Sequence, residues 1–242
     1  MRSILFSAHF NRDKNPERIA FLEAVAAALP KDTGVIAFDL SGTVKANFPV
    51  ISGNNPKRDV PNDAAAKLKA RLVELLGSKA GAIHQHAVGE VEALGNNQNR
   101  LIASFLDRID CFVRAVETNE PAYCYLWNQF NAFHRFAEAW LRRRGTPVGF
   151  FHDGVLPGSI AIDFDGEMGA SWITNRPEAL SSIPVDDAEI ESARRFLKWS
   201  RDGGVSRHKQ TETILVAESL ETAGFAGKPM IFYAGQNDWH AG

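Results

Sequence analysis

Alternation of apolar runs with helical segments is the feature of this sequence that most constrains its fold. Residues 122–127 form a β-prone, nearly all-apolar run, which is typical of a central parallel strand because both of its faces are buried. Comparable runs at 4–8, 35–40 and 147–151 are separated by segments with the spacing of amphipathic helices. Strands that alternate with helices predict an α/β domain with a Rossmann-like, doubly wound parallel sheet.

The remaining segments complete this pattern. Predicted helices cover 16–29, 62–76, 96–116, 131–144, 186–199 and 211–223, and shorter strands are predicted at 82–86 and 229–234. Residues 42–61 are expected to form a long loop. Glycine, proline and small polar residues dominate from 159 to 184, which predicts irregular structure with one short hairpin.

The end of the sequence bears on the domain organisation. A parallel strand normally needs a crossover helix after it, yet the chain stops soon after the predicted strand at 229–234. We therefore expect the N-terminal portion of a longer two-domain protein. A Rossmann-like domain would span 1–225, and 226–242 would be the first strand and turn of a second domain.

Composition and charge exclude several classes of function. The formal net charge of −2 argues against a general nucleic-acid-binding protein. Cys111 and Cys124 form neither a metal-ligand spacing nor a disulfide framework, so we expect buried free thiols in a reducing compartment. His9 and Arg12 interrupt the first apolar run too early for a signal peptide, and no run approaches the roughly 20 residues of a membrane span. We predict a cytoplasmic protein.

Two polar clusters have competing interpretations. The basic run at 142–144 either complements the carboxyl end of its helix or meets an anionic ligand or membrane. His84 and His86 would face one side of a predicted strand, where exposure to solvent is favoured over metal binding because no matching carboxylate supports a metal. No metal site is expected. The sequence also lacks a glycine-rich dinucleotide loop, a P-loop and a nucleophile elbow.

The turn after the predicted strand at 147–151 combines a histidine, a carboxylate, two glycines, a proline and a serine. These are His152, Asp153, Gly154, Pro157, Gly158 and Ser159. In open α/β sheets, ligands bind just beyond the carboxyl ends of the strands. Asp153 is therefore interpreted either as a residue that caps the turn or as a carboxylate nucleophile or base, with Gly154 allowing a ligand to approach closely.

A second group of polar residues follows the predicted strand at 122–127. Asn128 or Asn131 can cap the next helix, which is the structural interpretation. The functional interpretation is that amides here bind an anionic or hydroxylated ligand, with His134 reaching the same site from the first helical turn. Both interpretations remain open at this point.

The turn pattern resembles that of a known enzyme family. The sequence 152–159, followed by Asp163, Gly166 and Ser171, is similar to the pattern of the retaining β-Kdo glycosyltransferases, namely glycosyltransferase family 99 and the related capsule Kdo transferases. The strand end at Trp127 and Asn128 and the turn at 235–238 also look like theirs. The likeness covers roughly residues 120 to 242.

The resemblance implies the N-terminal, acceptor-side half of a GT-B-like enzyme of two Rossmann-like domains. The donor would be CMP-Kdo, with no other cofactor, and the acceptor would be a sugar of a lipid-linked capsule or O-antigen glycan. The anomeric configuration of Kdo would be retained through a covalent adduct on Asp153, with His152 beside it. Peripheral contact with the inner membrane is a further alternative for such an enzyme.

The resemblance also implies which residues bind substrate. On the substrate side these are Asn128, Asn131, His134, Gly154, Pro157, Gly158, Ser159 and Ser171, and on the nucleotide side they are Gln236 and Asp238. The carboxylate of Kdo would need a cation, supplied by His134, His152 or Arg135. Two alternatives belong to other classes: a non-catalytic Rossmann-like module that binds a glycan or nucleotide, and a hydrolase that uses Asp153 with His152.

Overall fold

The computed structural model describes residues 2–10, 16–42, 44–53, 61–94, 97–154, 159–166 and 168–201. The chain divides into two compact units, residues 1–180 and 181–242. In the second unit the described secondary structure is dominated by helix α7 (Asp187–Arg201), which confirms the helix predicted at 186–199. The predicted helix at 211–223, the predicted strand at 229–234 and the predicted domain boundary at 225 lie outside the described residues.

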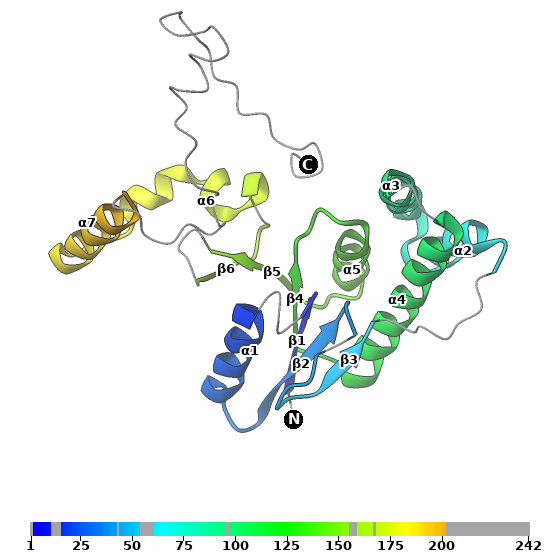
Figure 1. The fold of residues 1–242 in the computed structure, drawn as a ribbon, viewed down its shortest axis with the longest axis horizontal. Helices are drawn as coiled ribbons and strands as arrows, with labels where there is room; N and C mark the ends of the chain where they lie inside the picture. Colours follow the sequence, from blue (N-terminus) through cyan, green and yellow to red (C-terminus); the bar gives the residue numbers. More distant parts are fainter. Residues whose placement is uncertain are drawn as a thin grey trace, which may run out of the picture. The chain divides into compact units, whose positions relative to one another are not determined.

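The first unit is built on a mixed, six-stranded sheet with the order β3-β2-β1-β4-β5-β6 (Figure 1). Its strands are β1 (Arg2–Ala8), β2 (Thr33–Asp39), β3 (Val50–Ser52), β4 (Tyr123–Trp127), β5 (Val148–Asp153) and β6 (Ile160–Asp163). Neighbours from β3 to β5 run parallel, and β6 is antiparallel to β5. The predicted Rossmann-like α/β sheet is confirmed at this level. The short hairpin is expected within 159–184, but the described residues of that segment contribute only β6, which pairs with β5 instead.

Helices cover both faces of this sheet. They are α1 (Pro16–Ala28), α2 (Ala64–Leu76), α3 (Ala80–Ala93), α4 (Gln98–Asn119) and α5 (Ala132–Arg143). The short helix α6 (Trp172–Asn175) follows β6 in the chain. Among the described residues, short 3₁₀ helices lie at Gly77–Lys79, Met168–Ala170 and Pro177–Ser182. Helix α1 packs on one face and α2 to α5 on the other, which is the doubly wound arrangement (Figure 1).

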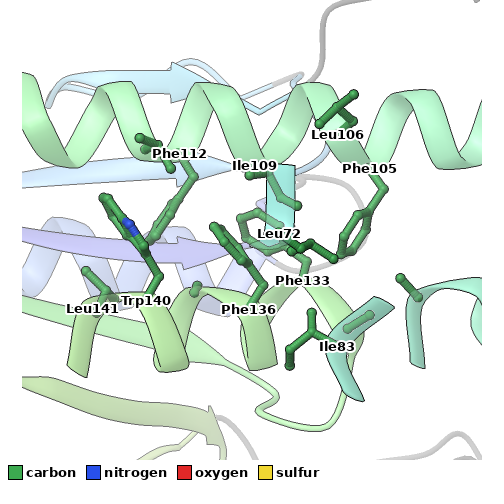
Figure 2. Close-up of a cluster of buried hydrophobic side chains, with 14 of the residues drawn as sticks. Leu72, Ile83, Phe105, Leu106, Ile109, Phe112, Phe133, Phe136, Trp140 and Leu141 are labelled. Atoms are coloured by element: carbon green, nitrogen blue, oxygen red, sulfur yellow. The ribbon is translucent and has the colours of Figure 1, made fainter. Parts of the chain in front are cut away.

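The larger core lies between the sheet and helices α4 and α5. Figure 2 shows the aromatic side chains of the two helices facing one another, with Phe112 of α4 in edge-to-face contact with Phe133 of α5 at 5.5 Å between ring centroids. Each fully buried side chain of this size stabilises the fold by about 1.5–3 kcal/mol. The smaller core joins α1 to the opposite face, where Phe6 meets Phe151 at 5.4 Å.

The predicted strand at 82–86 is wrong, because these residues lie within helix α3. The buried positions of α3 are Ala80, Ile83, Ala87 and Val91, which are spaced three or four residues apart, as on one face of a helix. The strand prediction rests on the alternation of two histidines, which is too short a pattern to distinguish a strand from a helix. On a helix, residues two apart point to different sides, so His84 and His86 do not share a face.

The expected loop at 42–61 contains strand β3. Val50 pairs with Ala37 and Ser52 with Asp39 in parallel register. A strand of three residues is too short to produce a recognisable period, and its position depends on pairing with β2. Among the described residues, none of the helices combines the length and the apolar character needed to cross a membrane.

Candidate functional site at the carboxyl edge of the sheet

The parallel strands end at one edge of the sheet, and the strand order reverses there between β1 and β4. From β1 the chain crosses to β2 on one side, whereas β4 leads to β5 on the other. Such a switch point is where open α/β sheets bind ligands. His9 follows β1, Asn128 follows β4, and Asp153 ends β5, so the edge brings these residues to one side of the sheet.

Asn128 and Asn131 build the turn that leads from β4 into α5. Asn128 has φ 59°, a left-handed conformation that asparagine tolerates, and its Oδ1 accepts a hydrogen bond from the Phe130 N–H at 3.0 Å. Asn131 caps α5, because its Oδ1 accepts from the His134 N–H at 2.8 Å. Both side chains serve the turn, in agreement with the structural interpretation.

His134 is fully buried beneath this turn. Its Nε2 lies 3.1 Å from the Ser7 hydroxyl, and its Nδ1 lies 2.9 Å from Asn131 Nδ2 and 3.1 Å from the Asn128 carbonyl oxygen. Burial lowers the pKa of His134 to about 3. The ring is therefore neutral, and the geometry favours packing over the expected contact with a ligand.

The first backbone amides of α5 have protein acceptors. The Ala132 N–H donates to Glu90 Oε1 at 2.8 Å, and the His134 N–H donates to Asn131. Glu90 also lies 3.1 Å from His86 Nε2, which is 2.8 Å from the Phe130 carbonyl oxygen. A carboxylate from α3 thus occupies a position where a helix start would otherwise attract an anion.

Asp153 and His152 end β5 and point to opposite faces of the sheet. Asp153 shares the face of Phe151, which is buried in the core on the α1 side, because side chains alternate along a strand. His152 Nδ1 donates to the Asp153 carbonyl oxygen at 2.8 Å, so this contact is made through the backbone. Both residues are half-buried.

Gly154 begins the tight connection between β5 and β6. Its N–H donates to the Ser159 carbonyl oxygen at 2.8 Å. A Cβ at residue 154 would collide with Ser159 Oγ and would lie 3.0 Å from Ser159 Cβ. The close packing against Ser159 therefore favours glycine at residue 154. Pro157 and Gly158, like Gln236 and Asp238, lie outside the described residues.

Ser171 caps the short helix α6, with its Oγ accepting from the Thr174 N–H at 3.2 Å. Asp163 organises the preceding loop by accepting from the backbone N–H groups of Asp165 and Trp172, each at 2.8 Å. This loop reaches the turn after β4, because a Cβ at Gly166 would lie 2.9 Å from Gln129 Oε1.

Three basic residues that the sequence interpretation did not single out lie at the switch point. We call His9, Arg18 and Arg108 the switch-point basic residues. Arg18 Nη1 donates to the His9 carbonyl oxygen at 3.1 Å, and the Arg18 guanidinium lies 3.5 Å from the centroid of the Trp127 ring. This stacking is a cation–π contact.

The charges of these residues affect one another. Burial is the largest cause that lowers the pKa of His9, and the positive charge of Arg108 is the next. The negative charge of Asp39 raises this pKa, and the positive charge of Arg18 lowers it further. His9 also keeps exposed surface, so water partly screens these charges. The edge is nevertheless locally cationic in a chain whose formal net charge is −2.

The sequence did contain a signal for Arg108. It lies three residues after Phe105 and four before Phe112, both of which are buried, so the helix directs its stem toward the core. A cation at a core-facing position is uncommon unless it has a partner.

The three arginines at the end of α5 have structural contacts. Arg142 pairs with Glu138 at 2.9 Å, Arg143 donates to the Leu75 carbonyl oxygen at 3.2 Å, and Arg144 stacks on Trp140 at 4.9 Å from the ring centroid. These contacts favour the interpretation that the cations complete the carboxyl end of a helix.

Within the part of the chain that the structure describes, no group of three or more His, Cys, Asp or Glu side chains is arranged to hold a metal ion. Comparisons with protein-family models, curated proteins and solved structures find no match to this chain. The residues at the sheet edge are therefore the basis for assigning a function.

Proposed function

We propose that this chain is the acceptor-side part of a GT-B-like, retaining glycosyltransferase that moves Kdo from CMP-Kdo to a sugar of a lipid-linked capsule or O-antigen glycan. The observation that carries the proposal is the position of Asp153 at the carboxyl end of a parallel strand, one strand away from the switch point. The resemblance of the 152–159 turn to the Kdo transferases supplies the substrate class.

The reaction has two displacements at the anomeric carbon of Kdo. In the first, the Asp153 carboxylate forms a bond to that carbon, and CMP leaves with the bonding electrons on its phosphate oxygen. In the second, the acceptor hydroxyl displaces Asp153 and gives its proton to a base. Two inversions retain the configuration of the sugar.

The cationic edge provides electrostatic support for this assignment. Kdo carries a carboxylate, and a site for it must offset that charge. His134 is not suited to this role, because burial keeps its ring neutral. Arg18 and Arg108 lie at the switch point, and a guanidinium is the side chain best suited to bind a carboxylate.

We do not expect the acceptor-side part to transfer sugar alone, so the test is intact-mass spectrometry of the product of the full-length reading frame after incubation with CMP-Kdo, beside Asp153→Asn and the control Asp165→Asn. Asp165 is a carboxylate of the same loop region that pairs with Arg176 at 3.3 Å. We expect a mass gain of one Kdo in the wild type and in the control, and none in Asp153→Asn. Full transfer activity in Asp153→Asn, or neither adduct nor CMP release in the wild type, would overturn the proposal.

A second candidate is a non-catalytic Rossmann-like module that binds a glycan or nucleotide. The cationic switch point favours it, because binding there needs no nucleophile. Saturable binding of CMP-Kdo without CMP release would identify such a module. The geometry weighs against the Asp/His hydrolase, since the side chains of Asp153 and His152 point to opposite faces of the sheet.

A further inference from the structure

The guanidinium group of Arg108 is directed toward the protein interior, and no carboxylate pairs with it among the described residues. Its Nε is buried and has no hydrogen-bond partner, and the ion pairs found among the described residues do not include it. Its stem passes close to the end of β3, because its Cγ would lie 3.4 Å from a Cβ added at Gly53. Burial lowers the pKa of Arg108, and Glu90 opposes this effect.

The two carboxylates whose charges act on His9 and Arg108 accept hydrogen bonds from other donors. Asp39 is fully buried and accepts hydrogen bonds from the N–H groups of Phe10 at 3.0 Å, Ser41 at 2.9 Å and Val44 at 3.2 Å. It also accepts from the Ser41 hydroxyl at 2.6 Å. Asp39 therefore holds together the two loops that follow β1 and β2.

Glu90 is committed in the same way. Its Oε1 accepts from the Ala132 N–H at 2.8 Å and lies 3.1 Å from His86 Nε2. Its charge acts on Arg108 from a distance, outside ion-pair range. A guanidinium that is largely removed from water and left without a partner is unfavourable, and an anion that binds there removes this penalty.

The neighbouring basic residues strengthen the attraction for an anion. The positive charges of Arg108 and Arg18 both lower the pKa of His9, so both guanidinium groups act at the same place. Arg108 and His9 also lower the pKa of the buried His134 ring, which lies below the same edge of the sheet. The positive charge is thus concentrated where the strand order reverses.

We propose that Arg108 and His9 form a subsite for an oxyanion, the carboxylate or phosphate group of a small ligand, with Arg18 adding positive charge from the first turn of α1. A guanidinium presents paired N–H donors that match both groups. The subsite is needed by a binding module as much as by a transferase. It therefore does not rest on Asp153 or on the Kdo assignment.

The test follows the His9 ring by proton NMR while inorganic phosphate or acetate is titrated into the full chain, in a buffer free of other oxyanions. The His9 signal is assigned by its loss in His9→Gln. We expect a saturable shift with at least one probe, and the relative affinities of the two probes tell a phosphate-binding from a carboxylate-binding subsite. Absence of a saturable shift with both probes would overturn the proposal.

Two variants locate the site. Arg108→Gln should weaken binding of the effective probe by about tenfold or more, whereas Arg114→Gln, six residues along the same helix and exposed, should not. Equal binding by Arg108→Gln would contradict the assignment.

Arg108→Met tests whether Arg108 lacks a partner within the protein. Removing an unpaired charge should leave the melting temperature unchanged or raise it when no anion is present. A clear fall would show that Arg108 pairs within the protein, and it would also overturn the proposal.

Discussion

The imidazole of His134 and the hydroxyl of Ser7 lie 3.1 Å apart in the protein interior, and they join the end of β1 to the first turn of α5. Both residues are fully buried. Asn131 reaches the other ring nitrogen at 2.9 Å while its Oδ1 caps the helix. The contact ties together the two elements beside the switch point and leaves His134 a structural role.

This buried histidine predicts a loss of stability in acid. The pKa of His134 is lowered to about 3 by burial, while the unfolded chain takes up the same proton near 6.5. Between these values the unfolded state binds more protons, so the free energy of unfolding decreases as the pH falls below 6.5. We expect a loss of about 2 kcal/mol between pH 7 and pH 5 from this residue.

Urea unfolding at several pH values measures this effect. His134→Asn should lower stability at pH 7, because hydrogen bonds are lost, but should flatten the dependence on pH. His86→Asn, which removes a half-buried imidazole of α3, controls for the loss of a histidine. Identical pH slopes in the wild type and in His134→Asn would contradict the assignment.

Gly154 is predicted to be intolerant of any side chain. A Cβ there would collide with Ser159 Oγ and lie 3.1 Å from the Ser159 carbonyl carbon. Gly154→Ala should reduce the free energy of unfolding by about 1–3 kcal/mol, as overpacking does. Gly154→Ala combined with Ser159→Gly should recover part of that loss, as measured by denaturant unfolding. No recovery would mean that the backbone, rather than the serine side chain, limits the turn.

Much of the sheet could be predicted from local pattern. The run at 122–127 is apolar on both faces because β4 lies between β1 and β5 with helices on both sides, and this burial is visible in the sequence itself. Strand β3 was not predictable in this way. Its three residues form a strand by pairing with β2, which is a tertiary effect.

The candidate site was predictable only in part. Asp153 and Asn128 fall at strand ends, where sequence alone indicates function, but the sequence does not show which polar groups have internal partners. Asn131 and His134 satisfy each other, whereas Arg108 lacks a partner among the described residues. That difference arises from contacts between α4, α5 and β1, far apart along the chain.

Gly89 is predicted to be a site where the protein can be stabilised. It lies on the exposed side of α3, and a Cβ there would meet nothing within 4 Å. Gly89→Ala should raise the free energy of unfolding by roughly 0.5–1 kcal/mol, because alanine loses less backbone freedom in a helix.

The matched comparison for Gly89→Ala is Gly149→Ala within β5. There a Cβ would lie 2.6 Å from Tyr125 Cε1, on the neighbouring strand. We expect the same substitution to destabilise the protein at residue 149, as measured by thermal unfolding. A lower melting temperature for Gly89→Ala would show that α3 is not helical at this residue.

The two thiols are predicted to differ in reactivity. Cys124 is fully buried in β4, and burial raises its pKa to about 12, whereas Cys111 is half-buried on α4. Because the thiolate is the reactive form, a disulfide reagent at pH 8 should label Cys111 and leave Cys124 unmodified until the protein unfolds. Native Cys111→Ser should therefore show almost no labelling, and denatured Cys111→Ser should show one reactive thiol. Rapid labelling of native Cys111→Ser would mean that β4 opens readily, in conflict with its position in the centre of the sheet.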